Sequence, residues 1–205
     1  MTTIASNKGL GGRLPLLDPA TLSPVQRSLY DSLQSNWVSF ADKIGVQATT
    51  DGGRLIGPFN FFLLHPEITV KLSEFQVAEE KNTTLPKRAR EVVIITVGAI
   101  WGADYELYAR GQAARAVGLS EAAVATIIAG GIPDELNEQE RIAARLAREL
   151  ASRYRVDSEL YEAAQQAFGR QGLFDIIAVM GIYHTVCSGL ALFEVPAPHR
   201  SAKPA

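Results

Sequence analysis

Residues 85–100 read LPKRAREVVIITVGAI, and this stretch decides the fold class. It begins with Pro86 and a charged turn, a composition that suits the start of a helix. From residue 92 onward it is apolar on nearly all sides, which is typical of a helix buried at the centre of a domain. The β-branched residues at 92–97 are also compatible with a strand. A helix is favoured because the run continues a proline-initiated turn and has helical segments on both sides.

The segments before this stretch carry apolar residues at helical spacing. One helix is expected to start at Ser23, a residue type that caps helices, and to end near Gly45. Its apolar positions recur every three or four residues at Leu29, Leu33, Trp37 and Phe40. A loop is expected at 47–58, and a second long helix opens after His65. Its expected inner positions are Ile68, Leu72, Phe75 and Val77.

The segments after the central stretch complete an all-α pattern. Helices are expected at residues 103–117, 120–130, 137–154, 157–168 and 173–193. No segment alternates apolar and polar residues as a half-buried strand would. The expected fold is therefore all-α, a single compact domain of about eight helices over residues 20–198. Residues 1–19 are expected to form an N-terminal arm, and residues 199–205 a flexible tail.

The composition excludes several classes of function. The chain has 205 residues, of which 47% are hydrophobic and 20% charged, and its formal net charge is −2. Since Lys and Arg are not clustered, no nucleic-acid partner is expected. The one cysteine, Cys187, excludes an internal disulfide and a zinc site built on cysteine pairs, and no metal is expected. Without a signal peptide or a run of about 20 apolar residues, a cytoplasmic protein with no membrane partner is expected.

Glu91 is the first candidate for chemistry. It lies about one turn into the central helix, directly before the apolar half. Burial would disfavour the charged carboxylate and raise its pKa toward the range useful to a general acid or base. The structural alternative is an ion pair with Lys87 or Arg88, or an interaction with the positive end of the helix. The sequence leaves both interpretations open.

A second cluster lies at residues 101–110, WGADYELYAR. Glu106 and Arg110 are four residues apart, the spacing of an ion pair on one helix face. In the functional interpretation Arg110 binds an anionic substrate, Glu106 or Tyr105 handles a proton, and Trp101 forms a pocket wall. The structural alternative is an ordinary ion pair on a solvated helix.

The last expected helix carries His184 and Cys187, which are three residues apart and therefore share a face. A cysteine and a histidine can act as nucleophile and base, but no orienting acid is visible beside this pair. A buried cysteine usually packs as a small hydrophobic residue, whereas His184 needs a polar partner on an apolar helix. His65, which follows the aromatic run at 59–62, is expected either to cap a helix or to face a pocket.

Several of these segments together resemble the carboxymuconolactone decarboxylase and alkylhydroperoxidase D-like family. They are residues 85–94, 105–106 and 113–120 in the centre, 57–60 before them, and Tyr183 with 193–196 at the end. The resemblance covers about residues 14–198. It implies a compact helical fold that assembles as a trimer or hexamer.

The alkylhydroperoxidase D branch of this family uses residues that the chain lacks. The resemblance places the two redox thiols of that branch at Ala103 and Glu106 and its histidine at Arg110, so that Glu91 alone matches. Peroxide reduction by this route needs a thiolate and a resolving thiol, and Cys187 lies elsewhere. The decarboxylase branch needs no metal or cofactor and acts on a small acidic lactone by proton transfer. It carries histidine where this chain has Arg110.

The leading interpretation is a cofactor-independent lyase or isomerase of aromatic catabolism, using acid/base chemistry on a small carboxylated organic acid or lactone. Glu91, Arg110 and His184 are expected to converge on one cavity. The expected catalytic residues are Glu91, His184 and Tyr105; the expected substrate-binding residues are Arg110, Arg88, Trp101, Glu106, Asn60, Phe59, Phe62, His65 and Tyr183. The alternatives are a thiol-dependent antioxidant that uses Cys187 and a non-catalytic oligomer that binds a ligand or partner.

Overall fold

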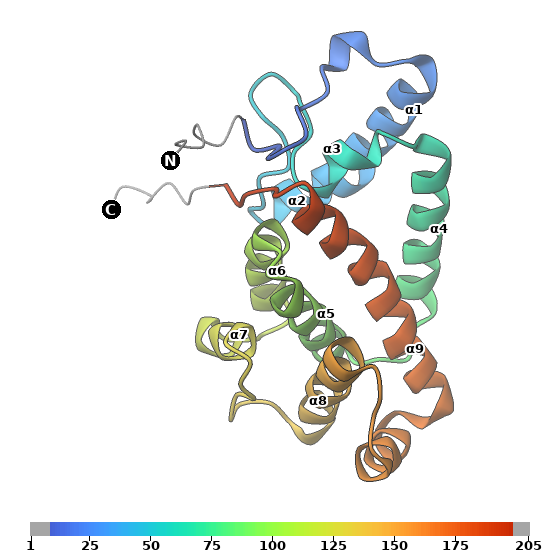
Figure 1. Ribbon diagram of the computed structural model, residues 1–205, viewed down its shortest axis with the longest axis vertical. Helices are drawn as coiled ribbons and strands as arrows, with labels where there is room; N and C mark the ends of the chain where they lie inside the picture. Colours follow the sequence, from blue (N-terminus) through green and yellow to red (C-terminus); the bar gives the residue numbers. More distant parts are fainter. Residues whose placement is uncertain (1–8, 199–205) are drawn as a thin grey trace.

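The computed structural model describes residues 9–198, and within them the protein is built from helices (Figure 1). The one β pairing among these residues is an isolated bridge between Thr49 and Leu55. This confirms the all-α prediction. The elements in chain order are η1 (Pro19–Thr21), α1 (Pro24–Leu33), η2 (Gln34–Val38), α2 (Ser39–Lys43), α3 (Pro58–Phe62), α4 (Pro66–Asn82), α5 (Lys87–Trp101), α6 (Asp104–Ala116), α7 (Glu121–Ile128), α8 (Glu138–Arg153) and α9 (Ser158–Leu192).

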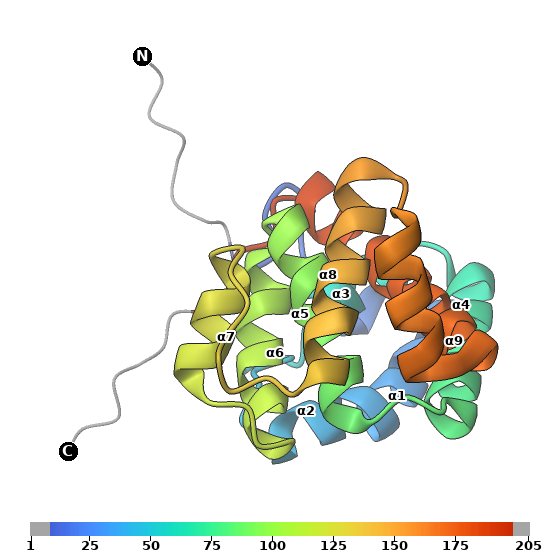
Figure 2. The same ribbon diagram turned by 90° about the horizontal axis from the view of Figure 1, so that it is seen from below.

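Helix α5 is the central element of the fold. Residues 91–98 are all buried, so every face of this stretch is covered by protein. The helix packs against α6, α7, α8 and α9, and Figure 2 shows it near the middle of the bundle between α7 and α9. It ends at Gly102, whose φ of 58° forms a left-handed C-cap. The β-branched run at 92–97 is therefore helical, because surrounding helices bury it on all sides.

Helix α9 consists of two helical segments that meet at Gly169. This glycine has φ 64° and ψ 176°, which lie outside the helical region. The two separate helices expected on either side of residue 169 are therefore confirmed. By length and composition α9 could cross a membrane. However, it is interrupted at Gly169 and packs against α5 and α8 in the core, as the core helix of a soluble protein does.

The first long helix is continuous but contains an irregular turn. A capping box between Ser23 and Gln26 starts α1. The π-helical turn η2 then leads into α2, which ends at Lys43, close to the expected end at Gly45. The extra residue of a π-helical turn changes which side chains face inward. Phe40, expected on the same face as Leu29 and Leu33, is exposed for this reason.

The expected inner face of α4 is wrong at three of its four positions, and only Leu72 is partly buried. Ile68, Phe75 and Val77 are exposed, and the buried residues of this helix include Thr69 and Glu79. Glu79 forms a buried ion pair with Arg90 of α5, in which Arg90 Nε lies 3.0 Å from Glu79 Oε1. This polar pair, together with a hydrogen bond from the Thr69 hydroxyl to the Phe62 carbonyl, fixes how α4 is rotated. Apolar spacing alone gives no sign of either interaction.

The described part of the expected N-terminal arm lies against α3 and the end of α9. Asn60 holds it with two hydrogen bonds: its Oδ1 accepts from the Leu17 N–H, and its Nδ2 donates to the Pro15 carbonyl. Arg13 forms an ion pair with Glu194. Residues 1–8 of the expected arm and the whole expected tail at 199–205 lie outside the described residues.

Candidate functional site

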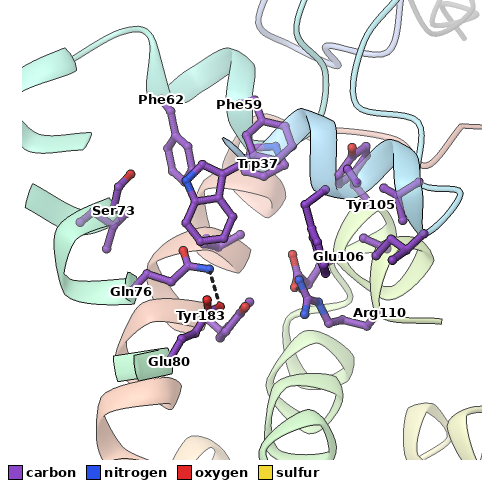
Figure 3. A pocket seen from close by; sticks show the side chains of 18 residues that line it. Trp37, Phe59, Phe62, Ser73, Gln76, Glu80, Tyr105, Glu106, Arg110 and Tyr183 are labelled. Atoms are coloured by element: carbon purple, nitrogen blue, oxygen red, sulfur yellow. Dashed lines mark hydrogen bonds and ion pairs between the residues drawn. The ribbon is translucent and has the colours of Figure 1, made fainter. Parts of the chain in front are cut away.

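A pocket opens among the α1–α2 region, α3, α4, α6 and α9. Its volume is about 110 Å³, well below the roughly 300–1,000 Å³ of sites that take drug-sized ligands. Its size suits a small organic molecule. Figure 3 shows three aromatic side chains along one side, Trp37, Phe59 and Phe62.

Two sets of polar side chains face each other across this pocket (Figure 3). Helix α4 contributes Ser73, Gln76 and Glu80. Helix α6 contributes Tyr105, Glu106 and Arg110, and α9 adds Tyr183 between the two. The pocket is therefore mainly apolar with a few convergent polar groups, which is the usual composition of a site for a small molecule.

The loop before α3 is held against the pocket by two tyrosines of α6. The Tyr105 hydroxyl donates to the Gln47 carbonyl at 2.7 Å, and the Tyr108 hydroxyl accepts from the Gln47 N–H at 2.9 Å. Gly57, with φ 64°, lies directly on the Tyr105 ring, where a Cβ would come within 2.3 Å of the ring carbons. Glycine at this position allows the close approach that closes this side of the pocket.

Arg110 and two carboxylates form a buried charged cluster at one end of the pocket. Arg110 Nε lies 2.9 Å from Glu106 Oε1, and Arg110 Nη1 lies 3.5 Å from Glu91 Oε2. The exposed fractions of these side chains are 22% for Arg110, 4% for Glu106 and 7% for Glu91. Although Arg110 Nε and Glu106 Oε1 are close, their orientation does not make a hydrogen bond, and Glu91 Oε1 has no hydrogen-bond partner among the described residues. The cluster is thus ion-paired but incompletely hydrogen-bonded.

Arg110 lies near two carboxyl groups in this cluster, and the pKa of each is raised. Burial raises the pKa of Glu91, and the nearby Glu106 carboxylate raises it further, while Arg110 opposes the rise. Burial likewise raises the pKa of Glu106 against the opposing effect of Arg110. Because a guanidinium keeps its charge, one positive charge faces two carboxyls that resist ionising together. A carboxyl with a raised pKa is suited to accept and return a proton near neutral pH.

Tyr183 completes this end of the pocket. Its ring lies under the Arg110 guanidinium, with the Cζ atom 5.1 Å from the ring centre. Burial raises the pKa of Tyr183 to about 12. Its hydroxyl therefore keeps its proton at neutral pH and can donate a hydrogen bond to a bound molecule.

The structure brings together many of the residues expected to form a site. Those that line the pocket are Tyr105, Glu106, Arg110, Phe59, Phe62 and Tyr183. Glu91 does not line it but contacts Arg110 from behind. Glu91 and Arg110 are therefore in contact, but they do not both line one cavity as expected. The physical basis of this contact is the packing of α5 against α6.

His184 and Trp101 do not line this pocket, contrary to their expected place in it. The Trp101 indole N–H donates a hydrogen bond of 2.7 Å to His184 Nδ1, and both side chains are partly exposed. Burial lowers the pKa of His184. The polar partner that a histidine on an apolar helix needs is thus the indole of Trp101, so the expected convergence of His184 with Glu91 and Arg110 is wrong.

Three other expected binding residues also lie outside this pocket. Arg88 is bound by Glu140, with Nε 2.7 Å from Oε1, and it also donates to the Gly118 carbonyl. Asn60 uses its amide to hold residues 15–17. His65 is exposed and lies 3.4 Å from Glu67. Arg88 and Asn60 are thus occupied by contacts within the protein, and sequence spacing does not reveal these contacts.

One whole side of the pocket was not expected from the sequence. Trp37 was identified only as a helix-face residue, and Ser73, Gln76 and Glu80 were not considered. The spacing of the last three, at 73, 76 and 80, is that of one helix face and was available as a signal. Their convergence with α6 depends on the rotation of α4, which the Glu79–Arg90 pair fixes.

Cys187 is fully buried and does not line the pocket. Burial raises the pKa of its thiol well above the ordinary range, which disfavours the reactive thiolate. Among the described residues, no group of three or more His, Cys, Asp or Glu side chains is arranged to hold a metal ion.

Comparison with known proteins identifies the segment that holds the charged cluster of this site. The family model described as "Carboxymuconolactone decarboxylase family" matches residues 66–149. This segment of the chain belongs to the carboxymuconolactone decarboxylase family. It comprises α4 to α8 and includes Glu91, Glu106 and Arg110.

Two solved structures show the same fold as this chain. One is described as an alkylhydroperoxidase AhpD core, an uncharacterized peroxidase-related protein from Ralstonia eutropha JMP134. It has 16% sequence identity and a TM-score of 0.71, over 92% of this chain and 93% of that one. The other is an uncharacterized peroxidase-related protein from Silicibacter sp. TM1040, with 15% identity and a TM-score of 0.70 over 96% of each chain. No functionally curated protein matches the chain. The fold is therefore alkylhydroperoxidase D-like, as expected.

Proposed function

We propose that this protein is a lyase or isomerase that works by acid/base chemistry on a small organic molecule, with Glu106 as the proton-transferring residue. The observation that supports this is the cluster of Glu106, Arg110 and Glu91, in which two buried carboxyls share one guanidinium. Glu106 is the member with a carboxyl that both lines the pocket and has a raised pKa. These are the two requirements for a general acid or base.

In the proposed reaction Glu106 takes a proton from a carbon or hydroxyl of the bound molecule and later returns it. The step starts with both Glu106 and Glu91 ionised, so when Glu106 gains the proton Arg110 remains paired with Glu91 and no buried charge is left alone. The Tyr183 hydroxyl and the free N–H groups of Arg110 lie at the same end of the pocket. They can stabilise negative charge that develops on an oxygen of the substrate.

Glu91 acts in this proposal as a positioning residue and not by touching the substrate. It holds Arg110. Because it competes with Glu106 for this guanidinium, it keeps the pKa of Glu106 higher than Arg110 alone would allow. Tyr105 is assigned a wall position, because its hydroxyl donates to the Gln47 carbonyl. His184 is left without a part in proton transfer at this pocket, since it binds Trp101.

Three other parts of the expected function stay proposals. The absence of a cofactor and a cytoplasmic location follow from the sequence analysis alone, as does assembly into trimers or hexamers. A thiol peroxidase reaction has the support of a fold shared with peroxidase-related proteins, but the buried Cys187 with its raised pKa argues against it.

The proposed acid/base chemistry can be tested before the substrate is known. We would incubate the protein in D₂O with a panel of small ketones, lactones and organic acids and follow deuterium incorporation by NMR. Glu106→Gln should slow the exchange of the best panel member by about 10²–10⁴-fold, the usual contribution of general acid/base catalysis. Glu149→Gln, at an i, i+4 ion pair with the exposed Arg153, is the control and should leave exchange unchanged. Equal exchange by the Glu106→Gln variant would reject the proposal.

A second measurement separates the proposed roles of the two carboxyls. Glu91→Gln removes the neighbouring carboxylate and leaves Arg110 to Glu106 alone, so the pKa of Glu106 should fall. The pH profile of exchange should therefore move to lower pH, with activity retained. Complete loss of exchange with no shift in the profile would instead place Glu91 in direct contact with the substrate.

A further inference from the structure

The charged side chains around the pocket carry an excess of negative charge. Arg110 is the one cation among the described residues that line it, and Glu106 and Glu91 already surround this residue. Glu80, on the opposite side, adds a further carboxylate. If Glu91 and Glu106 share a proton, they balance Arg110 and leave Glu80 uncompensated. If both are ionised, the excess of negative charge is larger.

Arg90 does not remove this excess. It reaches Glu80 at 3.4 Å, but its main partner is Glu79, which it binds through both Nε and Nη2. The Glu79 side chain is 1% exposed and that of Glu80 is 41% exposed. Across both clusters, four carboxyls therefore face two guanidinium groups.

Glu80 lies where a molecule would enter. A groove of about 900 Å³ runs between the α1–α2 region and α4. Trp37, Phe40, Ser73 and Glu80 line both this groove and the pocket, so the two spaces adjoin at these residues. Lys43 and Lys81 line the groove but not the pocket. Glu80 is thus the charged side chain among these shared residues.

We propose that the pocket selects an organic molecule without negative charge, and that Glu80 is a specificity-determining residue at its entrance. This rests on the same site as the proposed function and departs from the carboxylated substrate expected from the sequence. A carboxylate entering the pocket would pass Glu80 and meet a guanidinium whose charge is already balanced. It would also lose hydration without gaining a free cation, which is unfavourable in an apolar cavity.

The charge selection can be measured by binding alone. The chain has two tryptophans, so a Trp101→Phe variant leaves Trp37, in the pocket wall, as the fluorescent reporter. We would titrate it at pH 7.5 with cyclopentanone, cyclopentylammonium and cyclopentanecarboxylate, which share one ring and differ in charge. Calorimetric titration of the unaltered protein checks that the ranking does not depend on the variant.

Cyclopentanone or cyclopentylammonium should bind at least about tenfold more tightly than cyclopentanecarboxylate, a ratio that corresponds to roughly 1.4 kcal/mol. Comparing the affinities of cyclopentanone and cyclopentylammonium tells whether an uncharged or a cationic molecule is preferred. Glu80→Gln should narrow the ratio by about two- to fivefold, the range for a partly exposed charge. Glu67→Gln, on the same helix but outside both the pocket and the groove, should leave the ratio unchanged.

Tighter binding of the carboxylate than of the other two molecules would overturn this inference, as would binding of none of them. So would a Glu80→Gln variant that behaves like Glu67→Gln. None of these outcomes depends on turnover, and deuterium exchange that requires Glu106 would still support the proposed chemistry. If deuterium exchange did not require Glu106 while the charge selection held, the proposed chemistry would be rejected and the charge selection would stand.

Discussion

Replacing Arg110 tests the buried cluster most directly. Arg110→Met keeps much of the aliphatic length of the side chain but removes the one positive charge that Glu91 and Glu106 share. At the observed distances of 2.9 and 3.5 Å, each attraction is about 5 kcal/mol for an effective dielectric constant of roughly 20. Desolvation of the ions offsets much of this. The expected net loss of stability at pH 8 is therefore about 3–5 kcal/mol, the usual effect of leaving buried charges unpaired.

The loss should depend on pH in a definite direction. Arg110 lowers the pKa of both Glu91 and Glu106, so its removal raises these two pKa values further. A carboxyl with a folded pKa above its unfolded value stabilises the fold at low pH, and this stability is lost as pH rises through the folded pKa. The variant should therefore be close to the unaltered protein near pH 5 and fall progressively below it toward pH 8.

Urea unfolding at pH 5, 6.5 and 8 measures this effect. The matched control is Arg153→Met, which removes an i, i+4 pair of the same spacing as Arg110 and Glu106, but with the arginine side chain 72% exposed. It should cost less than about 1 kcal/mol at every pH. Adding Glu91→Gln and Glu106→Gln to Arg110→Met should recover most of the loss at pH 8. A loss for Arg110→Met that equals the control, or that does not change with pH, would refute the buried-charge argument.

Two further predictions concern the pocket wall and the thiol. Gly57→Ala should destabilise the protein by about 3 kcal/mol or more in urea unfolding, because it adds a clash with the Tyr105 ring to the cost of φ 64°. The control is Gly102→Ala, at φ 58° with no neighbouring atom within 4 Å, which should cost only about 1–2 kcal/mol. Equal losses would mean that the Tyr105 contact does not matter. Cys187 should react with a thiol reagent at pH 8 no faster than the protein unfolds, since its side chain is fully buried; rapid labelling of the folded protein would contradict its assignment to the core.

The helical architecture was predictable to a large extent because its signals are local. Proline and serine at helix starts, glycine at ends, and the apolar run at 92–97 identified most helices and the central position of α5. Helix α3 was missed, since five residues are too few to show a helical period. The inner face of α4 was wrong because a buried pair, Glu79 with Arg90, and not apolar spacing, sets its rotation.

The candidate site was predictable only in part. Glu106 and Arg110 are one helical turn apart, so their pairing follows from local geometry. The contact of Arg110 with Glu91 requires that α5 and α6 pack together, which residue spacing does not show. His184 was expected in the same cavity because an imidazole on an apolar helix needs a polar partner. The two side chains project from α9 in different directions, and Tyr183 alone lines the pocket.

By itself the sequence determined most of the helical segments, that α5 is buried, and that no pair of cysteines exists for thiol chemistry. Tertiary structure decided which polar side chains meet: Glu91 behind Arg110, α4 across from α6, and His184 on Trp101. The physical reason is the range of the interactions. Helix formation depends on residues within about four positions of each other, whereas the charge and shape of the pocket depend on the rotation and packing of helices far apart in the chain.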